Sequence, residues 1–225
     1  GTMAHRVLGV AADAGLEVVV IDHHQAEPSL PPAFALVNPN RLDDESGLGS
    51  LAAVGVAFLF IVAINRVLRE AGHYKDGKEP DLLSLLDLVA LGTVCDVVPL
   101  VGLNRAFVSQ GLRVMFKRGN VGLAALGDVA RLDGKPAAYH LGFLLGPRVN
   151  AGGRVGRSDL GARLLTTEDK DEAEAIAMEL DVLNKERQAI EADVLTLAME
   201  QLENRQETTR KNELPSVVVA SGKGW

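Results

Sequence analysis

The chain has 225 residues, of which 47% are hydrophobic and 24% are charged, with 23 Gly and 9 Pro. This composition is typical of a globular protein and excludes a disordered chain or a collagen. The single cysteine, Cys95, excludes an intramolecular disulfide and fits a reducing cytosol. The longest apolar run, residues 51–64, is shorter than the roughly 20 residues of a membrane span, and residues 1–10 do not resemble a signal peptide. We therefore expect a soluble cytoplasmic protein.

The net charge is −7, which taken alone argues against binding to nucleic acid, because phosphate groups are bound by Lys and Arg. The negative charge is not evenly distributed, however. Residues 166–213 hold 14 acidic and 6 basic residues, whereas residues 140–165 hold four Arg and one Asp. The second of these segments is compatible with an anion site.

Two short apolar segments predict strands. Residues 17–22 follow a small-residue helical stretch that ends at Gly15, and their β-branched run between turn signals is typical of a buried, parallel strand. Residues 34–38 predict a second strand, which Asn38-Pro39-Asn40 ends.

Helices are predicted from there onward. Residues 51–71 predict a buried core helix that stops at Gly72. Asp81 is placed to cap the next helix, which ends at Cys95-Asp96, and Asn104 is placed to open a helix over 105–118. A further short helix is expected over 121–132. The buried face of the helix after Asp81 is expected to contain Leu82, Leu85, Leu86, Val89 and Ala90.

The C-terminal half contains three segments of different character. Residues 142–161 are rich in Gly and Arg and predict a functional loop. Between 167 and 205, apolar residues recur at heptad-like steps, interrupted by Arg187, and predict one amphipathic helix of about 55 Å that connects two lobes. Residues 215–222 predict a strand, and we expect the chain to end just inside a second domain.

Asp22-His23-His24 follows the first predicted strand, and carboxylate and imidazole groups at the carboxyl end of a strand are suitable ligands for Mn²⁺ or Zn²⁺. The triplet alone leaves open whether these residues bind metal or phosphate or only form a turn. Asp96 lies in an apolar run, where it fits either a metal ligand or the cap of the next turn. Asp169-Lys170-Asp171 is interpreted as a helix cap. No role is assigned to the isolated histidines, which are His5, His73 and His140.

Six segments of the chain are distinctive when taken together. They are VVVIDHH (18–24), NPN (38–40), LAAVGVAF (51–58), LLDLVALGTVCDVVPL (85–100), GPRVNAGGRVG (146–156) and LNKERQ (183–188). In composition and order they resemble the DHH phosphoesterase superfamily, and specifically the RecJ single-strand exonucleases. The DHH-family pyrophosphatases share the triplet but lack the last two segments.

The resemblance implies an α/β fold with a parallel-sheet DHH phosphoesterase domain and many helices over residues 1–167. A long connector helix and linker would follow over 168–213, and the first strand of a DHH-associated domain over 214–225. It also implies that the chain starts after two aspartate motifs that such a site needs, with Gly1 matching the glycine of the second. We therefore expect the chain to be inactive by itself and to bind DNA weakly, with strong salt dependence.

The activity implied by the resemblance is the 5′-to-3′ hydrolysis of single-stranded DNA in repair and recombination, with two Mn²⁺ or Mg²⁺ ions. The implied partners are single-stranded DNA, single-strand-binding protein and other repair proteins, and the implied state is a monomer. The implied metal ligands are Asp22, His23 and Asp96, with His24 near the scissile phosphate. The implied phosphate-binding residues are Arg148, Asn150 and Arg154. Cys95 would be a packing neighbour.

Two other functions remain open at this point. One is a DHH-family phosphodiesterase that acts on short oligonucleotides, cyclic dinucleotides or pyrophosphate. The other is a DHH scaffold that has lost its metals and binds DNA or a replication partner. Retention of Asp22, His23, His24 and Asp96 argues against the scaffold.

Overall fold

The computed structural model describes residues 1–75, 77–208 and 217–222. This part of the chain is mostly helical and contains a small parallel sheet, which confirms the predicted fold class. The elements are, in order, α1 (His5–Asp13), β1 (Val19–Ile21), β2 (Ala35–Val37), α2 (Ala53–Glu70), η1 (Leu82–Leu85), α3 (Leu86–Cys95), α4 (Gly102–Phe116), α5 (Val121–Val129), η2 (His140–Leu145), α6 (Gly146–Val155), α7 (Leu160–Thr166) and α8 (Lys170–Thr208).

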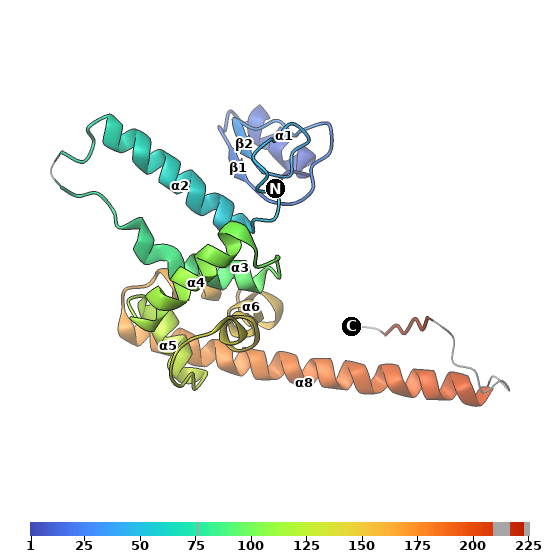
Figure 1. Ribbon diagram of the computed structural model, residues 1–225. Helices are drawn as coiled ribbons and strands as arrows, with labels where there is room; N and C mark the ends of the chain where they lie inside the picture. Colours follow the sequence, from blue (N-terminus) through green and yellow to red (C-terminus); the bar gives the residue numbers. More distant parts are fainter. Residues whose placement is uncertain (76, 209–216, 223–225) are drawn as a thin grey trace.

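The sheet lies in a small N-terminal lobe together with α1, and the remaining helices after α2 form a larger body (Figure 1). β1 and β2 are parallel, with Val20 opposite Leu36, and both strands lie within the predicted segments. The parallel arrangement brings the carboxyl ends of the two strands to the same edge of the lobe. Asp22 and Asn38, the first residues after each strand, are therefore neighbours.

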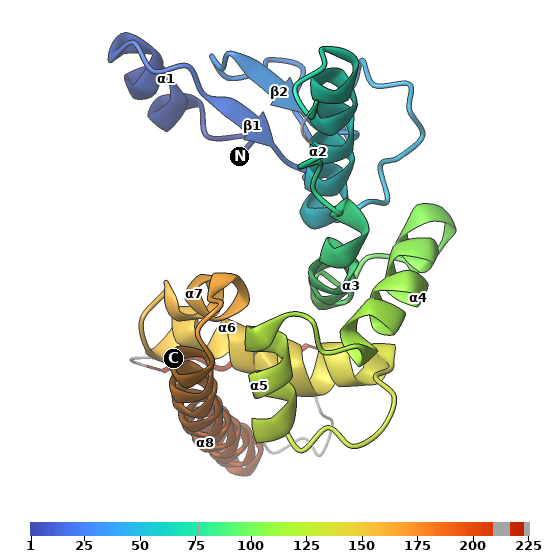
Figure 2. The same ribbon diagram turned by 90° about the vertical axis from the view of Figure 1, so that its left-hand side faces the viewer.

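Helix α2 connects the lobe to the helical body and ends before Gly72, which has a left-handed φ of 74°, as predicted. The prediction of a buried core helix is wrong for its C-terminal half. Phe58 is 7% exposed, but Ile61 and Ile64 are 40% and 42% exposed. The reason is visible in Figures 1 and 2, where this half of α2 extends away from the helical body.

Asp81 caps the following helix as predicted, since its carboxylate accepts a hydrogen bond from the Leu83 amide. The first turn is the 3₁₀ helix η1, and of the predicted buried face Leu85 is 38% exposed. Asn104 does not open a helix, because it lies buried inside α4 and donates from Nδ2 to the Ser50 and Pro99 carbonyl oxygens, at 2.7 and 3.0 Å. Its amide therefore joins two loops.

The predicted loop over residues 142–161 is largely helical instead. The π-helix η2 continues without interruption into α6, and α7 follows after a short turn. Gly146 lies against Cys95 at the end of α3, where a Cβ atom would lie 2.4 Å from Sγ. Some of the glycines that suggested a loop, such as Gly146, thus allow two helices to pack closely.

Helix α8 has 39 residues and confirms the predicted long helix. Asp169 caps it by accepting hydrogen bonds from the Asp171 and Glu172 amides, at 2.9 and 3.1 Å. Its first turns pack on α5, α6 and α7, where Ile176 and Leu180 are buried, and its second half extends beyond the helical body (Figure 1).

The strand predicted over 215–222 does not form in residues 217–222, and residues 215–216 lie outside the described part of the chain. The Ser221 carbonyl oxygen instead accepts a hydrogen bond from Gln201 Nε2 of α8, at 2.9 Å. This segment therefore contacts α8, and no strand is assigned to its described residues. Among the described helices, none combines the length and apolarity needed to cross a membrane.

Candidate metal and phosphate site

The Asp22-His23-His24 turn is held by a dense set of hydrogen bonds centred on Asp22, which is 7% exposed. Asp22 Oδ2 accepts from the Thr2 amide and hydroxyl, at 2.5 and 2.8 Å, and Oδ1 accepts from the His23 amide at 2.7 Å. Oδ1 also contacts His24 Nδ1 at 2.7 Å. Burial alone would raise the pKa of Asp22, but these donors outweigh it and lower the pKa well below its usual range.

The segment after β2 completes this arrangement. Asn38, which is 3% exposed, donates from Nδ2 to the Thr2 hydroxyl and to the His24 carbonyl oxygen, both at 2.8 Å. Asn40 donates from Nδ2 to the His23 carbonyl oxygen at 2.6 Å. The two asparagines of the NPN segment therefore fix the backbone of both histidines from the neighbouring strand.

Asp96 comes to this turn from the C-terminal end of α3. Its Oδ2 lies 3.4 Å from His23 Nδ1, and the two side chains are 36% and 16% exposed. The following residue, Val97, has a φ of 59° and is 87% exposed. Left-handed backbone is unfavourable for a β-branched residue, so the sharp exit from α3 carries local strain beside Asp96.

The donor set of this site fits a divalent cation. The side chains of Asp22, His23 and His24 offer ligand atoms within 4.8 Å of one another. Two neighbouring ligands of an octahedral cation at about 2.1 Å are about 3 Å apart, close to the separation of His23 Nδ1 and Asp96 Oδ2. Asp22, by contrast, already accepts several hydrogen bonds on each oxygen. Asp22 nevertheless belongs to the group whose ligand atoms could share a cation with His23, so Asp22, His23 and Asp96 are all candidate ligands.

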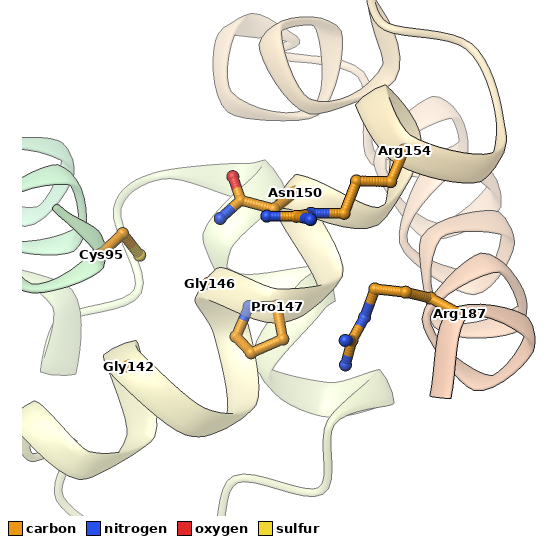
Figure 3. Close-up of a pocket in the computed structure, with 7 residues that line it drawn as sticks. All are labelled: Cys95, Gly142, Gly146, Pro147, Asn150, Arg154 and Arg187. Carbon is orange, nitrogen blue, oxygen red and sulfur yellow. The ribbon is translucent and has the colours of Figure 1, made fainter. Parts of the chain in front are cut away.

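A pocket of about 230 Å³ lies at the C-terminal end of α3, where it is lined by Cys95, the residue before Asp96. Figure 3 shows Cys95 on one wall and the polar side chains of Asn150, Arg154 and Arg187 on the other. Burial and the neighbouring Asp96 charge raise the pKa of Cys95 to about 11, so the thiol is neutral near pH 7 and forms a packing wall.

Asn150 and Arg154 are on α6 and both are exposed to solvent. Among the described residues, Arg154 forms no ion pair, whereas Arg187 of α8 pairs with Glu191 at 2.7 Å. A guanidinium group without an acidic partner keeps its donors for an anion. Two guanidinium groups and an amide therefore converge on one pocket, and this arrangement is suited to bind phosphate.

Arg148, the third predicted phosphate-binding residue, does not line this pocket. Its Nε donates to Asp181 Oδ1 on α8 at 2.9 Å, its Nη1 donates to the Leu144 carbonyl oxygen at 2.8 Å, and it is only 15% exposed. In this structure Arg148 joins α6 to α8.

Arg187 lines the pocket, although it was not among the phosphate-binding residues predicted from the sequence. The sequence does single out Arg187, because it is the charged residue that interrupts the apolar pattern of the long helix. The candidate metal ligands therefore come from the ends of β1 and α3, and the residues that line the pocket include ones from α3, α6 and α8.

Comparisons with known proteins agree with this arrangement. Residues 1–93 match the model of the DHH family, N-terminal domain. The chain is 43% identical to the single-stranded-DNA-specific exonuclease RecJ of Escherichia coli over 216 residues, which cover 92% of this chain and 37% of that protein. It is 37% identical to RecJ of Thermus thermophilus over 197 residues, which cover 87% of this chain and 27% of that protein.

Solved structures show the same relationship. The crystal structure of exonuclease RecJ bound to manganese matches with a TM-score of 0.75 at 35% identity, over 89% of this chain and 49% of that one. RecJ from Thermus thermophilus in complex with Mn²⁺ matches with a TM-score of 0.74 at 34% identity, over 89% of this chain and 29% of that one.

Residues 1–93 thus match the N-terminal domain of the DHH family. Over most of its length the chain is similar to the RecJ exonucleases, which confirms the resemblance seen in its sequence. The chain spans about 37% of the length of the RecJ relatives from Escherichia coli and Dickeya dadantii.

Proposed function

We propose that this chain is part of a metal-dependent exonuclease that hydrolyses single-stranded DNA from its 5′ end in DNA repair and recombination. The observation that carries the proposal is that His23 meets Asp96 at the end of α3, where the preceding residue, Cys95, lines the pocket of Asn150, Arg154 and Arg187. The RecJ relatives are single-stranded-DNA-specific exonucleases, and their solved structures include complexes with Mn²⁺ and Mg²⁺. We propose the cytoplasm as its location and a monomer as its state, with single-strand-binding protein as a candidate partner.

The proposed organisation assigns residues 1–167 to the DHH phosphoesterase domain. Residues 168–213 would be the connector helix and linker, and residues 214–225 would belong to a DHH-associated domain. The length of α8 supports the connector, because it extends well beyond the helical body (Figure 1).

The side chains have separate roles in this proposal. Asp22, His23 and Asp96 would hold Mn²⁺ or Mg²⁺, which supplies a bound water of lowered pKa and stabilises phosphate charge. Asp22 also fixes the turn through its hydrogen bonds and orients His24, whose Nδ1 it contacts. Nε2 of His24 is then left to contact the scissile phosphate. His24 is well placed for this role, because its side chain is 72% exposed.

The remaining phosphates of the strand would bind in the pocket. Arg154 and Arg187 neutralise their charge, and Asn150 donates a hydrogen bond. Arg148 acts as a positioning residue, since its contact with Asp181 fixes α6 against α8 and so sets the distance between the two pocket arginines.

The test is the Mn²⁺-dependent digestion of 5′-phosphorylated single-stranded DNA by the chain extended at both ends to the length of its RecJ relatives. We expect shortening from the 5′ end, lost on Asp96→Ala and on His23→Ala. Digestion that persists in both variants would refute the proposed site. Cleavage restricted to dinucleotides or cyclic dinucleotides would indicate the small-substrate phosphodiesterase. DNA binding without metal binding would indicate the scaffold.

A further inference from the structure

Two aromatic side chains lie exposed and stacked at the start of the π-helix η2, Tyr139 just before it and Phe143 within it. The ring centroids of Tyr139 and Phe143 are 5.1 Å apart with an interplanar angle of 24°, and the residues are 61% and 70% exposed. Neither ring contributes to the two apolar clusters that form the described core. Aromatic residues make up only 4% of the chain, so an exposed stacked pair is not a consequence of composition.

The pair lies on the helical segment that also supplies one wall of the arginine pocket. Residues four apart lie nearly in line on a helix, so Tyr139, Phe143 and Pro147 form one row that begins just before η2 and ends in α6. Gly142, Gly146 and Asn150 form the neighbouring row. Pro147 and the whole second row line the pocket, so the aromatic row meets the pocket wall at Pro147, one turn after Phe143.

The geometry of this row and the pocket suits a nucleic acid strand. Phosphate charge would be neutralised in the pocket by Arg154 and Arg187, and the bases of the same strand would lie outside it. A flat aromatic surface beside a positively charged groove is the combination that holds single strands without sequence preference. Packing in the core does not explain the exposed pair, because both side chains are mostly exposed and their described ring contacts are with each other and, for Tyr139, with His140.

We propose that Tyr139 and Phe143 form a stacking platform for a base of the single strand whose phosphates occupy the pocket of Asn150, Arg154 and Arg187. This inference rests on the proposed function and adds the residues that contact a base. Because every base presents a π-face, the platform binds strands of any sequence, as a non-specific exonuclease requires. A second copy of this chain is the alternative occupant.

Binding is measured at low salt in EDTA, so that the strand is not cut. The probes are a 5′-phosphorylated dodecamer that contains 2-aminopurine and an abasic dodecamer with the same number of phosphates. We expect the double variant Tyr139→Ala, Phe143→Ala to bind the base-containing strand about 5- to 150-fold more weakly. Its affinity for the abasic strand should be unchanged, and the quenching of 2-aminopurine on binding should be lost.

The control variants separate stacking from folding. Tyr139→Phe and Phe143→Tyr retain the rings and should retain binding and quenching. Phe116→Ala removes another exposed ring, on α4, and should leave both unchanged. All variants should keep the far-ultraviolet circular dichroism of the parent chain.

The two proposals fail in different ways. If Arg154→Gln and Arg187→Gln weaken binding of both strands but the aromatic double variant binds like the parent, the phosphate pocket stands and the platform is refuted. If the arginine variants bind both strands like the parent chain, the phosphate pocket is refuted. The platform then stands only if the aromatic double variant still loses the quenching of 2-aminopurine. A parent chain that binds neither strand would contradict both. A dimer that dissociates on the aromatic substitutions would assign the rings to self-association.

Discussion

Replacing Arg148 by Met should lower the stability of the fold and should have little direct effect on phosphate binding. Arg148 donates two hydrogen bonds, to Asp181 and to the Leu144 carbonyl oxygen, at a site where Arg148 is 15% and Asp181 13% exposed. Hydrogen bonds to charged groups contribute about 1.5–3 kcal/mol each and neutral ones about 1 kcal/mol. Lys185 Nζ, 2.7 Å from Asp181, would still compensate the carboxylate. We expect a loss of about 2–3 kcal/mol in the free energy of unfolding.

The assay is urea unfolding followed by circular dichroism, with Arg154→Met as the matched control. Arg154 is exposed and has no ion pair among the described residues, so its replacement should change stability by less than about 0.5 kcal/mol. The affinity for single-stranded DNA should fall more in Arg154→Met than in Arg148→Met. An Arg148→Met variant that is as stable as the parent chain but has lost DNA binding would refute this account, because Arg148 would then bind phosphate.

The ion pair also predicts a pH dependence. Burial alone would raise the pKa of Asp181, but Lys185 and Arg148 outweigh it and lower the pKa in the folded state. A carboxylate with a lowered folded pKa stabilises the fold above its unfolded pKa of about 3.9, and this contribution is lost as the pH falls through the folded value. The stability difference between the parent chain and Arg148→Met should therefore be constant from about pH 5 to 7 and shrink below about pH 4.

Three further substitutions test the local packing. Asn38→Ala removes the donor to the Thr2 hydroxyl and the His24 carbonyl oxygen and should cost about 2–3 kcal/mol in urea unfolding; a neutral effect would contradict the role given to the NPN segment. Val97→Gly should raise the unfolding free energy by about 1 kcal/mol, because glycine adopts the φ of 59° without strain and little burial is lost; a destabilised variant would show that no strain is stored there. Gly122→Ala would place Cβ 1.7 Å from the Leu164 carbonyl oxygen and should lower the melting temperature by many degrees, whereas Gly127→Ala, with open space around it, serves as the control.

Several elements could be predicted from the sequence because short-range signals determine them. The β-branched segment before Asp22 and the apolar segment before Asn38 both form strands, and Gly72 and Asp169 mark helix ends. The meeting of His23 with Asp96 could be expected only from the resemblance, since 73 residues separate them in the chain. Their contact depends on how α3 packs against the lobe.

The errors arise where a residue serves tertiary packing instead of local structure. Glycines of the GPRVNAGGRVG segment suggested a loop, but Gly146 and Gly152 allow α6 to pack closely against Cys95 and Leu180. Asn104 is a residue type that is preferred at helix N-caps, but its side chain instead donates hydrogen bonds to two loops inside the fold. Arg148 could not be distinguished from Arg154 by sequence, because only the structure shows that Asp181 lies opposite one of them.

The most direct test of the account is Mn²⁺ binding by the 225-residue chain, measured by electron paramagnetic resonance. His23→Ala and Asp96→Asn remove a proposed ligand, and Asp87→Asn is the control, because Asp87 lies on the same helix but lines a different pocket. We predict that the first two variants bind Mn²⁺ at least several-fold more weakly than the parent chain and that Asp87→Asn binds like the parent. Equal Mn²⁺ binding by the parent chain and Asp96→Asn would contradict the assignment of the metal to the end of α3.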